Sequence, residues 1–289
     1  MKTLLSVCTL ASLLFLTGCG GGTPEPAATA DAAVMQMVDS LKDNEPKGLW
    51  NMLPASYQTQ ANEVLHDFAN KMPPAVYDQG AELVVKLEKV LKTKKSLILE
   101  NPMLQQAPVD ASANYDQVVA ILGAITSSDL MSIDKLKSAD IGSLTSSIGG
   151  KMMEAASNLD TDQTPAGGDM KEALEFKKKL SSVKAELVSE EGDTAVVRIT
   201  VDGEEPEDMD FIKVEGKWIP TELAEEWSEM IAEAQAAVAE LNITPEQATQ
   251  AQMGMSMVGG VLDQLQQANT QEEMQQILGG LMGMAMGGM

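Results

Sequence analysis

The chain contains few of the residues from which catalytic and metal sites are commonly built. Its 289 residues include 2 Cys, 1 His and a single Arg, and its aromatic residues are 3 Trp, 3 Tyr and 4 Phe. One histidine, His66, excludes metal sites that require several imidazole ligands. Two cysteines exclude zinc ribbons, iron–sulfur clusters and a disulfide-stabilised scaffold.

Positive charge and enzyme motifs are scarce as well. The 20 Lys+Arg stand against 43 Asp+Glu, a formal net charge of −23. This balance excludes nucleic-acid binding, because phosphate contacts need clustered basic side chains. The sequence has no GxSxG, P-loop, HExxH or dinucleotide-binding motif. We therefore predict a protein that is not an enzyme and has no cofactor, while 44% hydrophobic residues suffice for a packed core.

The N-terminal segment combines a positive charge, an apolar run and a cysteine. Lys2 precedes an apolar stretch, residues 4–16, that is too short to span a bilayer stably. The stretch ends in Leu16-Thr17-Gly18-Cys19, which resembles the lipobox of bacterial lipoproteins. The resemblance implies cleavage before Cys19 and attachment of lipid to its thiol. An ordinary secretory signal with a chance cysteine is the alternative.

Lipidation would decide the location of the protein and the state of its cysteines. Cys8 would leave with the signal peptide, residues 1–18, so the mature chain would hold no internal disulfide. Because each buried methylene contributes about 0.8 kcal/mol, several acyl chains would hold the protein firmly in a membrane. Gly20 stands where an Asp would, by family analogy, favour the inner membrane. We therefore expect the periplasmic side of the outer membrane.

Composition divides the mature chain into three parts. Residues 19–30, rich in Gly, Pro, Thr and Ala, are expected to form a flexible tether. An α+β body is expected over residues 31–241, with a helical insertion at about 101–168. Residues 242–289 are rich in Met, Gly and Gln and are expected to form a helical tail.

Apolar residues at helical spacing predict that most of the body is helical. Asp31 is expected to cap the first helix, and residues 50–57 to form a short turn or loop. Thr221 is expected to cap a long helix. Capping-box sequences predict two more helices that begin at Thr244 and at Thr270.

The periodicity changes from helical to alternating between about residues 182 and 220. Alternating apolar runs are separated there by turn sequences at Glu191-Gly192-Asp193, at 203–208 and at Glu215-Gly216. The pattern predicts an antiparallel sheet of about four short strands, packed by helices. The predicted fold class is therefore α+β and rich in helices.

Two stretches resemble nuclear-transport-factor-two-like domains of bacterial lipoproteins. The first is the helix after Asp31 with the 50–57 segment and the helix that follows it. The second is FIKVEGKWI, residues 211–219, which is similar to the closing hairpin of that fold. The resemblance implies a cone-shaped pocket for a small molecule, with Trp218 at its base and Trp50 or Tyr57 near it. No position matches the catalytic Asp or Tyr pair of isomerases with this fold, so no catalytic residue is implied.

Two charged runs each allow more than one interpretation. The acidic run at 204–210 could bind calcium, but its spacing matches no ligand loop, and we expect a solvated hairpin tip. Five lysines fall within ten residues and could contact anionic headgroups, form a solvated helix face or pair with the acidic part of the body. These lysines are Lys86, Lys89, Lys92, Lys94 and Lys95.

Methionine is concentrated at the C-terminal end of the chain. Thioethers at M-x-M spacing suit Cu(I), and the candidate ligands are Met253, Met255, Met257, Met282, Met284 and Met286. No His or Cys accompanies them, and methionine also serves as adaptable filler in helix packing and on binding surfaces. We predict helix packing or an apolar tail, with partner or membrane contact and copper as alternatives.

The predicted anchor, the missing catalytic motifs and the Met-rich tail favour a lipid-anchored envelope protein that binds or scaffolds through protein contacts. The alternatives are the small-molecule pocket and Cu(I) handling by the tail. His66 falls on the polar side of its helix and is expected at the surface rather than as a general base. Residues 186–240 hold 17 acids against 3 basic residues, so we expect basic or apolar protein partners.

Overall fold

A computed structural model describes residues 26–102, 112–158 and 179–287 of the chain, the last seven by their backbone alone. The described chain is mostly helical with one four-stranded antiparallel sheet, which confirms the predicted α+β class. The strands are β1 (Lys184–Glu191), β2 (Thr194–Thr200), β3 (Glu207–Val214) and β4 (Lys217–Pro220). The helices are α2 (Ala30–Lys42), α3 (Pro46–Met52), α4 (Ala55–Lys71), α5 (Pro74–Thr93), α6 (Lys95–Leu99), α8 (Tyr115–Thr126), η1 (Asp129–Met131), α9 (Ile133–Leu136), α10 (Ile141–Ser157), η2 (Leu180–Ser182), α12 (Thr221–Glu240), α13 (Pro245–Gln267) and α14 (Gln271–Gly287).

The sheet is a meander in the order β1-β2-β3-β4, and each strand is antiparallel to the next. Its register places Lys213 opposite Trp218. Gly192 and Gly216 occupy turn positions with φ of 64° and 79°, a conformation that glycine adopts without a Cβ clash. The predicted meander is therefore confirmed, and β3 starts at Glu207, within a stretch that was expected to be a connection.

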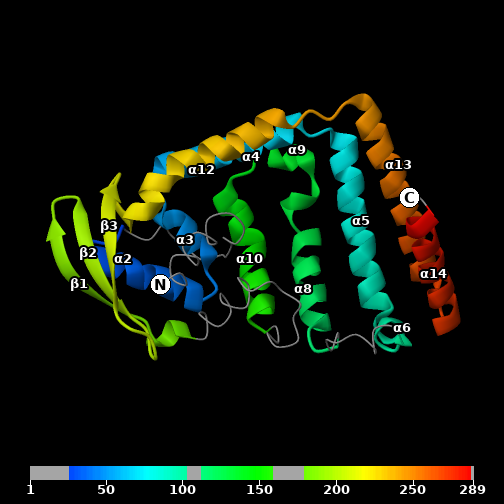
Figure 1. The fold of residues 1–289 in the computed structure, drawn as a ribbon, viewed down its shortest axis with the longest axis horizontal. Helices are drawn as coiled ribbons and strands as arrows, with labels where there is room; N and C mark the ends of the chain where they lie inside the picture. Colours follow the sequence, from blue (N-terminus) through cyan, green and yellow to red (C-terminus); the bar gives the residue numbers. More distant parts are fainter. Residues whose placement is uncertain (1–25, 103–111, 159–178, 288–289) are drawn as a thin grey trace.

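Helix α2 packs on one face of the sheet and buries it (Figure 1). Alternate strand residues point toward α2, so the two-residue period decides which side chains enter this core. Trp218 and Phe211 are its largest members and are 3% and 2% exposed. The full set of buried residues is Ala30, Ala33, Val34, Val38, Leu180, Val183, Ala195, Val197, Ile199, Val201, Phe211 and Trp218.

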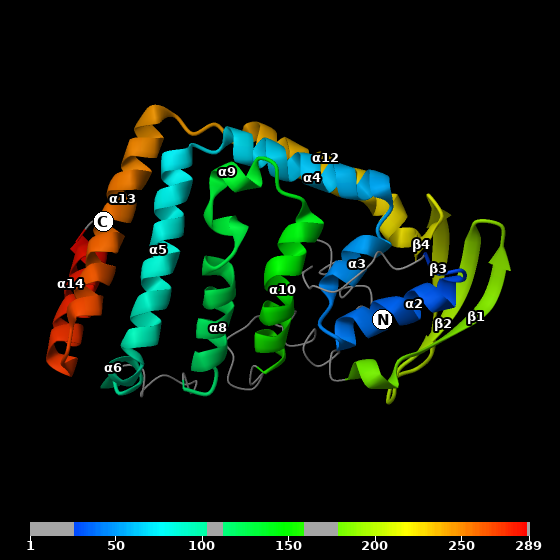
Figure 2. The ribbon, with the colours of Figure 1, turned by 180° about the vertical axis from the view of Figure 1, so that it is seen from behind.

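Long helices form a single row that extends away from the sheet. Helices α10, α8, α5 and α13 lie side by side in that order, and α14 packs on α13 at the end of the row (Figure 1 and Figure 2). Helix α3 contacts both α2 and α10 and so joins the row to the sheet. The sheet and α14 therefore lie at opposite ends of an elongated molecule.

Helices α4 and α12 lie together across one end of the row and run in the same direction. Near their starts, Tyr57 stacks on Trp227 with ring centroids 4.3 Å apart and planes 3° from parallel. Near their ends, Lys71 Nζ donates to the Ala239 carbonyl over 2.8 Å. This contact places a positive charge at the C-terminus of α12, where the helix dipole favours it.

Helices α5 and α13, which follow α4 and α12, also run side by side in one direction. Gln79 Nε2 donates to Ser256 Oγ over 2.8 Å, and about two turns further on Lys86 pairs with Asp263 at 2.8 Å. The α4–α5 unit and the α12–α13 unit are therefore matched in space, although they come from opposite halves of the chain.

Two smaller cores lie within the helical part. The first joins α4 to the α9 segment and contains the buried residues Ala69, Ile133, Leu136 and Leu144. The second joins α5 to α13 and α14 and contains Val90, Leu265 and Met274. The helical part is therefore held by several local clusters rather than by one central core.

The loop predicted over residues 50–57 is wrong, because most of it is helical. Pro46 fits the first turn of α3, where its missing N–H has no partner to lose. Gly48 lets α3 approach α2 closely, since a Cβ at this position would lie 2.2 Å from Ser40 Oγ. Trp50 therefore lies in α3 and Tyr57 in α4.

Two predicted helix caps are wrong and two are confirmed. Asp31 and Thr221 lie inside the first turns of α2 and α12 rather than at their N-caps. Thr244 caps α13 in a full capping box. Thr270 Oγ1 accepts from the Glu273 backbone N–H over 3.2 Å before α14. Both confirmed caps carry Glu or Gln three residues after Thr, which the wrong ones lack.

Candidate functional site

The predicted lipid attachment residue, Cys19, lies outside the described residues. The described chain begins against the sheet, where Trp218 Nε1 donates to the Ala28 carbonyl over 3.4 Å and Ala30 is fully buried. Residues 26–30, assigned by the sequence to the tether, therefore lie at the sheet end. Because an extended chain spans at most about 3.6 Å per residue, a lipid on Cys19 would hold the sheet end within roughly 25 Å of a membrane.

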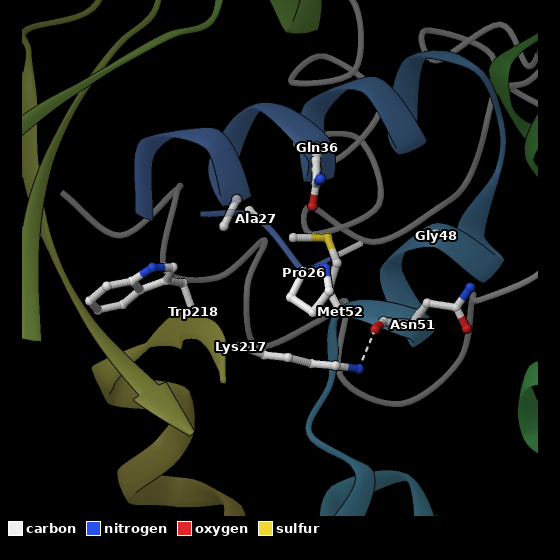
Figure 3. A pocket seen from close by; sticks show the side chains of 9 residues that line it. Pro26, Ala27, Gln36, Gly48, Asn51, Met52, Lys217 and Trp218 are labelled. Atoms are coloured by element: carbon white, nitrogen blue, oxygen red, sulfur yellow. Dashed lines mark hydrogen bonds between the residues drawn. The ribbon is translucent and has the colours of Figure 1, made fainter. Parts of the chain in front are cut away.

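A small cavity lies beside Trp218, between the sheet, α2 and α3 (Figure 3). Its volume is ≈ 20 Å³, enough for about one water molecule. Sites for small organic molecules are usually about 300–1,000 Å³. The cavity is lined by Pro26, Ala27, Ala33, Gln36, Gly48, Asn51, Met52, Lys217 and Trp218.

The three aromatic residues of the predicted pocket have different surroundings. Trp218 lines this cavity, and Lys213 Nζ lies 4.3 Å from its ring centroid. Trp50 is buried against α10, where a Cβ on Gly142 would lie 2.6 Å from the indole ring. Tyr57 stacks on α12 through Trp227, as described above. The structure therefore places the three rings in three separate contacts rather than around one space.

The turn between β3 and β4 fastens the sheet to α3 and α4. Glu215 Oε2 accepts from the Ser56 backbone N–H over 3.2 Å, in the first turn of α4, where the helix dipole favours a negative charge. Lys217 Nζ donates to the carbonyls of Asn51 and Leu53 over 2.5 and 2.7 Å, at the C-terminal end of α3. The acid and the lysine of one hairpin therefore provide hydrogen-bond partners for a backbone N–H at the start of α4 and for backbone carbonyls at the end of α3.

The ionisation of both residues responds to these contacts. Hydrogen bonds from Ser56 hold the pKa of Glu215 below its ordinary value. Burial lowers the pKa of Lys217, and the nearby Glu215 carboxylate partly opposes that shift. Sequence reasoning identified the Gly-Lys-Trp turn but not this role, because Lys217 and Asn51 are 166 residues apart.

Two lysines of the 86–95 run fasten α5 to α13. Lys86 forms the ion pair with Asp263 described above. Lys94 Nζ donates to the carbonyl of Ala268, the C-cap of α13, over 2.6 Å. The partners of Lys86 and Lys94 therefore lie in the tail, not in the acidic part of the body with which pairing was predicted.

Glu88 is a buried acid that sequence reasoning did not identify. It is 9% exposed, and burial alone would raise the pKa of its carboxyl. Lys92, one turn later, and Thr126 Oγ1, at 2.6 Å, both donate to the carboxylate, and the net pKa lies below the ordinary value. Glu88 therefore joins α5 to α8 as a charged group. The sequence signal for this position is helical spacing, which places Glu88 on the same side of α5 as the apolar residues Val84 and Leu91.

The C-terminal methionines have different environments. Met253 and Met257 are 58% and 66% exposed, Met255 is half-buried, and Met274 is 2% exposed in the α13–α14 core. The side chains of the other three Cu(I) candidates lie outside the described part; they are Met282, Met284 and Met286. Within the described residues, no group of three or more His, Cys, Asp or Glu is placed to hold a metal ion.

His66 differs from the sequence expectation. It is half-buried, and its Nε2 lies 2.7 Å from the Ala139 carbonyl oxygen, the distance of an N–H···O hydrogen bond. The expectation of a surface histidine is therefore corrected, because His66 links α4 to the segment that precedes α10.

The acidic run at 204–210 lies partly in β3. Asp208 forms a two-point ion pair with Arg198, whose Nε and Nη2 lie 2.7 and 2.8 Å from its carboxylate oxygens. This pairing lowers the pKa of Asp208. Glu204 pairs with Lys179 at 2.7 Å. Two of the five acids in the run are thus engaged by basic side chains.

Comparison with family models, curated proteins and solved structures finds no match for this chain. Among the described helices, none is both long and apolar enough to cross a bilayer. The interpretation of function therefore rests on the residues and contacts of this chain itself.

Proposed function

We propose that this protein is a lipid-anchored component of a bacterial cell envelope with a non-enzymatic binding or scaffolding role through protein contacts. The lipobox-like segment that ends in Cys19 supports the anchor, and Gly20 favours the periplasmic side of the outer membrane. Ala30 is buried and the Ala28 carbonyl accepts from Trp218, so a lipid on Cys19 would lie close along the chain to the sheet end of the molecule.

One observation carries the binding role: an exposed, uncharged surface along α13. Helical spacing places four exposed residues on one side of α13, and we call this surface the methionine face. It consists of Met253, Met257, Gly260 and Gln264. A Cβ on Gly260 would meet nothing within 4 Å, so the face has an open shallow position beside two flexible thioether side chains.

Charge separates this face from the rest of the acidic surface. No Lys or Arg follows Lys217, and the one acid in the middle of α13, Asp263, is paired with Lys86. Flexible methionines adapt to varied apolar partners, as they do on promiscuous binding surfaces. Because the face lies at the end of the molecule farthest from the sheet, an anchored molecule would present it away from the membrane.

The binding role is tested by site-specific photocrosslinking in intact cells. A photoreactive residue in place of Met257 is expected to crosslink to specific proteins. Adding the Met253→Gln change to the same chain is expected to abolish these crosslinks. The matched control is Val118, an apolar residue of α8 that is 44% exposed. Equal adducts at Val118 and Met257, or no adducts at Met257, would reject the methionine face as the contact surface.

The anchor is tested separately with Cys19→Ala. We expect the Cys19→Ala variant to lose metabolic labelling by fatty acid and to move to the soluble fraction. The Cys8→Ala variant is expected to be labelled and to stay in the membrane fraction. Normal labelling of the Cys19→Ala protein would overturn the proposed location.

A further inference from the structure

Strand β1 forms an open edge of the sheet. It pairs with β2 on one side, and no described strand or loop pairs with its other side. In both views β1 is the outermost element at its end of the molecule (Figure 1 and Figure 2). Alternate residues of such a strand direct backbone N–H and C=O groups outward, which gives an extended peptide a template for pairing.

The side chains of β1 are unusually accessible. Seven of its eight residues are exposed, and only Ala185 is half-buried. Leu187 and Val188 are 39% and 48% exposed, so the edge combines free backbone with apolar surface. This combination is what strand-adding recognition sites present to a peptide.

The charge around this edge is mainly negative. Glu186, Glu190 and Glu191 are exposed on β1 itself, and Asp193 follows in the turn. The single arginine of the sheet, Arg198, lies opposite Glu186 in the register and is held by Asp208 through two hydrogen bonds. Lys184, at the start of the strand, is the one basic side chain on β1. The edge therefore attracts a basic segment and repels a second copy of this acidic chain.

A bulge limits how the edge can be used. The β1–β2 register shifts between Leu187 and Ser189, which leaves Val188 without an opposite residue. Bulges twist an edge and interrupt its ladder, and proteins use them with charged residues to prevent repeated strand addition. The geometry of β1 therefore suits the addition of one short partner strand rather than repeated addition of strands from further molecules.

We propose that β1 binds an extended Lys- or Arg-rich segment of a partner protein by adding it as a fifth strand of the sheet. Main-chain hydrogen bonds hold the segment. Its apolar side chains lie beside Leu187, on the face of the sheet that carries α2, and its basic side chains face Glu186 and Glu191 on the opposite face. This site is independent of the methionine face, since the two lie at opposite ends of the molecule. Together they would let one molecule contact two partners.

The experiment uses a fluorescent eight-residue peptide of alternating Lys and Val, and the chain from residue 19 onward with the Cys19→Ser change. Fluorescence anisotropy is expected to show saturable binding. The same peptide with alternate backbone nitrogens methylated keeps its charge but loses half of its hydrogen-bond donors. We expect it to bind at least about tenfold more weakly.

Charge-reversal variants locate the site. Glu186→Lys combined with Glu191→Lys, two acids on the face of β1 opposite α2, is expected to weaken binding about tenfold or more. Glu229→Lys combined with Glu233→Lys, exposed on α12, changes the net charge equally and is expected to change affinity less than about twofold. Hydrogen exchange should show protection of residues 184–191 by the peptide in the unaltered protein.

Three results would overturn the proposal. They are equal binding of the methylated peptide, equal losses in the two charge-reversal variants, and protection that bypasses residues 184–191. The Met253→Gln variant should bind the peptide normally, so a failure here leaves the proposed role of the methionine face untouched. Circular dichroism of each variant confirms that the fold is retained.

Discussion

The sheet end and the α13–α14 end of the molecule are stabilised in different ways. At the sheet end, twelve buried residues pack between α2 and strands that follow one another along the chain. At the other end, three buried residues, Val90, Leu265 and Met274, join α5 to helices from the far end of the sequence. The first end has a broad core and a highly charged surface, and the second has a small core and an uncharged face. A broad core tolerates local opening less than a small one, so the two ends should differ in stability.

The largest effect is expected from Trp218→Ala. This change removes the largest buried side chain of the sheet core together with its contact to Lys213, and should lower the free energy of unfolding by about 3–5 kcal/mol. Urea denaturation measures the loss, and hydrogen exchange should show faster exchange in β2, β3 and β4. A loss below about 1 kcal/mol would contradict the assignment of Trp218 to the core.

Met274→Ala is the equivalent change at the other end. Removing this 2% exposed side chain should cost about 2–4 kcal/mol. Because the surrounding core is small, we expect faster hydrogen exchange in α13 and α14 with little change in the sheet. If hydrogen exchange at the amides of the sheet becomes faster to the same extent, the two ends unfold as one unit and do not differ in stability.

Gly142→Ala tests the junction between the ends. A Cβ at this position would lie 2.6 Å from the Trp50 ring, so α10 and α3 would have to separate, at a cost of about 1–3 kcal/mol. Gly260→Ala is the matched control within a helix, because a Cβ there meets nothing within 4 Å. It should stabilise the protein by up to about 1 kcal/mol through helix propensity. Thermal unfolding that shifts equally in both variants would refute the steric argument.

The smallest expected effect is the pH dependence that Glu215 contributes. Its pKa is lowered in the folded protein, so its stabilising contribution is present above the unfolded pKa, about 4.3, and is lost as pH falls through the folded value. Glu215→Gln should therefore flatten the decrease in unfolding free energy between about pH 5 and pH 3. Glu225→Gln, an exposed acid of α12, serves as the control. An unchanged slope in the Glu215 variant would show that the Ser56 contact is absent in solution.

The sequence predicted the sheet well because its information is local. Val197, Ile199 and Val201 alternate with Arg198 and Thr200, and Gly192 and Gly216 mark the turns, so strand order follows from short connections. The helix caps at Thr244 and Thr270 were predictable for the same reason, since a capping box lies within four residues.

Helix α10 lies within the predicted helical insertion, but its extent could not be predicted from local sequence. Its Ser- and Gly-rich sequence has a weak helical signal, yet Thr145 and Ser146 hydroxyls donate back to the Gly142 carbonyl over 2.7 and 2.9 Å. Such side-chain bonds compete with helix formation in isolated segments. Packing against α3 and α8 decides the outcome here, and that packing is not visible in a window of sequence.

For the candidate sites too, the sequence predicted some features, and others depended on tertiary packing. The burial of Trp218 follows from its strand position, but the separation of Trp50 and Tyr57 into other contacts depends on where α10 and α12 lie. The exposure of Met253 and Met257 depends on which side of α13 packs against α5. The residue types identified these aromatic and methionine residues as candidates. Their neighbours and their exposure, however, are decided by tertiary packing.

The matched α4–α5 and α12–α13 units have a consequence for how the chain acquires its structure. Their contacts link residues separated by up to 177 positions, so the row of helices cannot close until synthesis has passed α13. Long-range closure of this kind slows folding and leaves the apolar side of α5 uncovered on the nascent chain. The export that the proposed lipid anchor requires would benefit, because a chain that folds late can still pass through a membrane in an extended form.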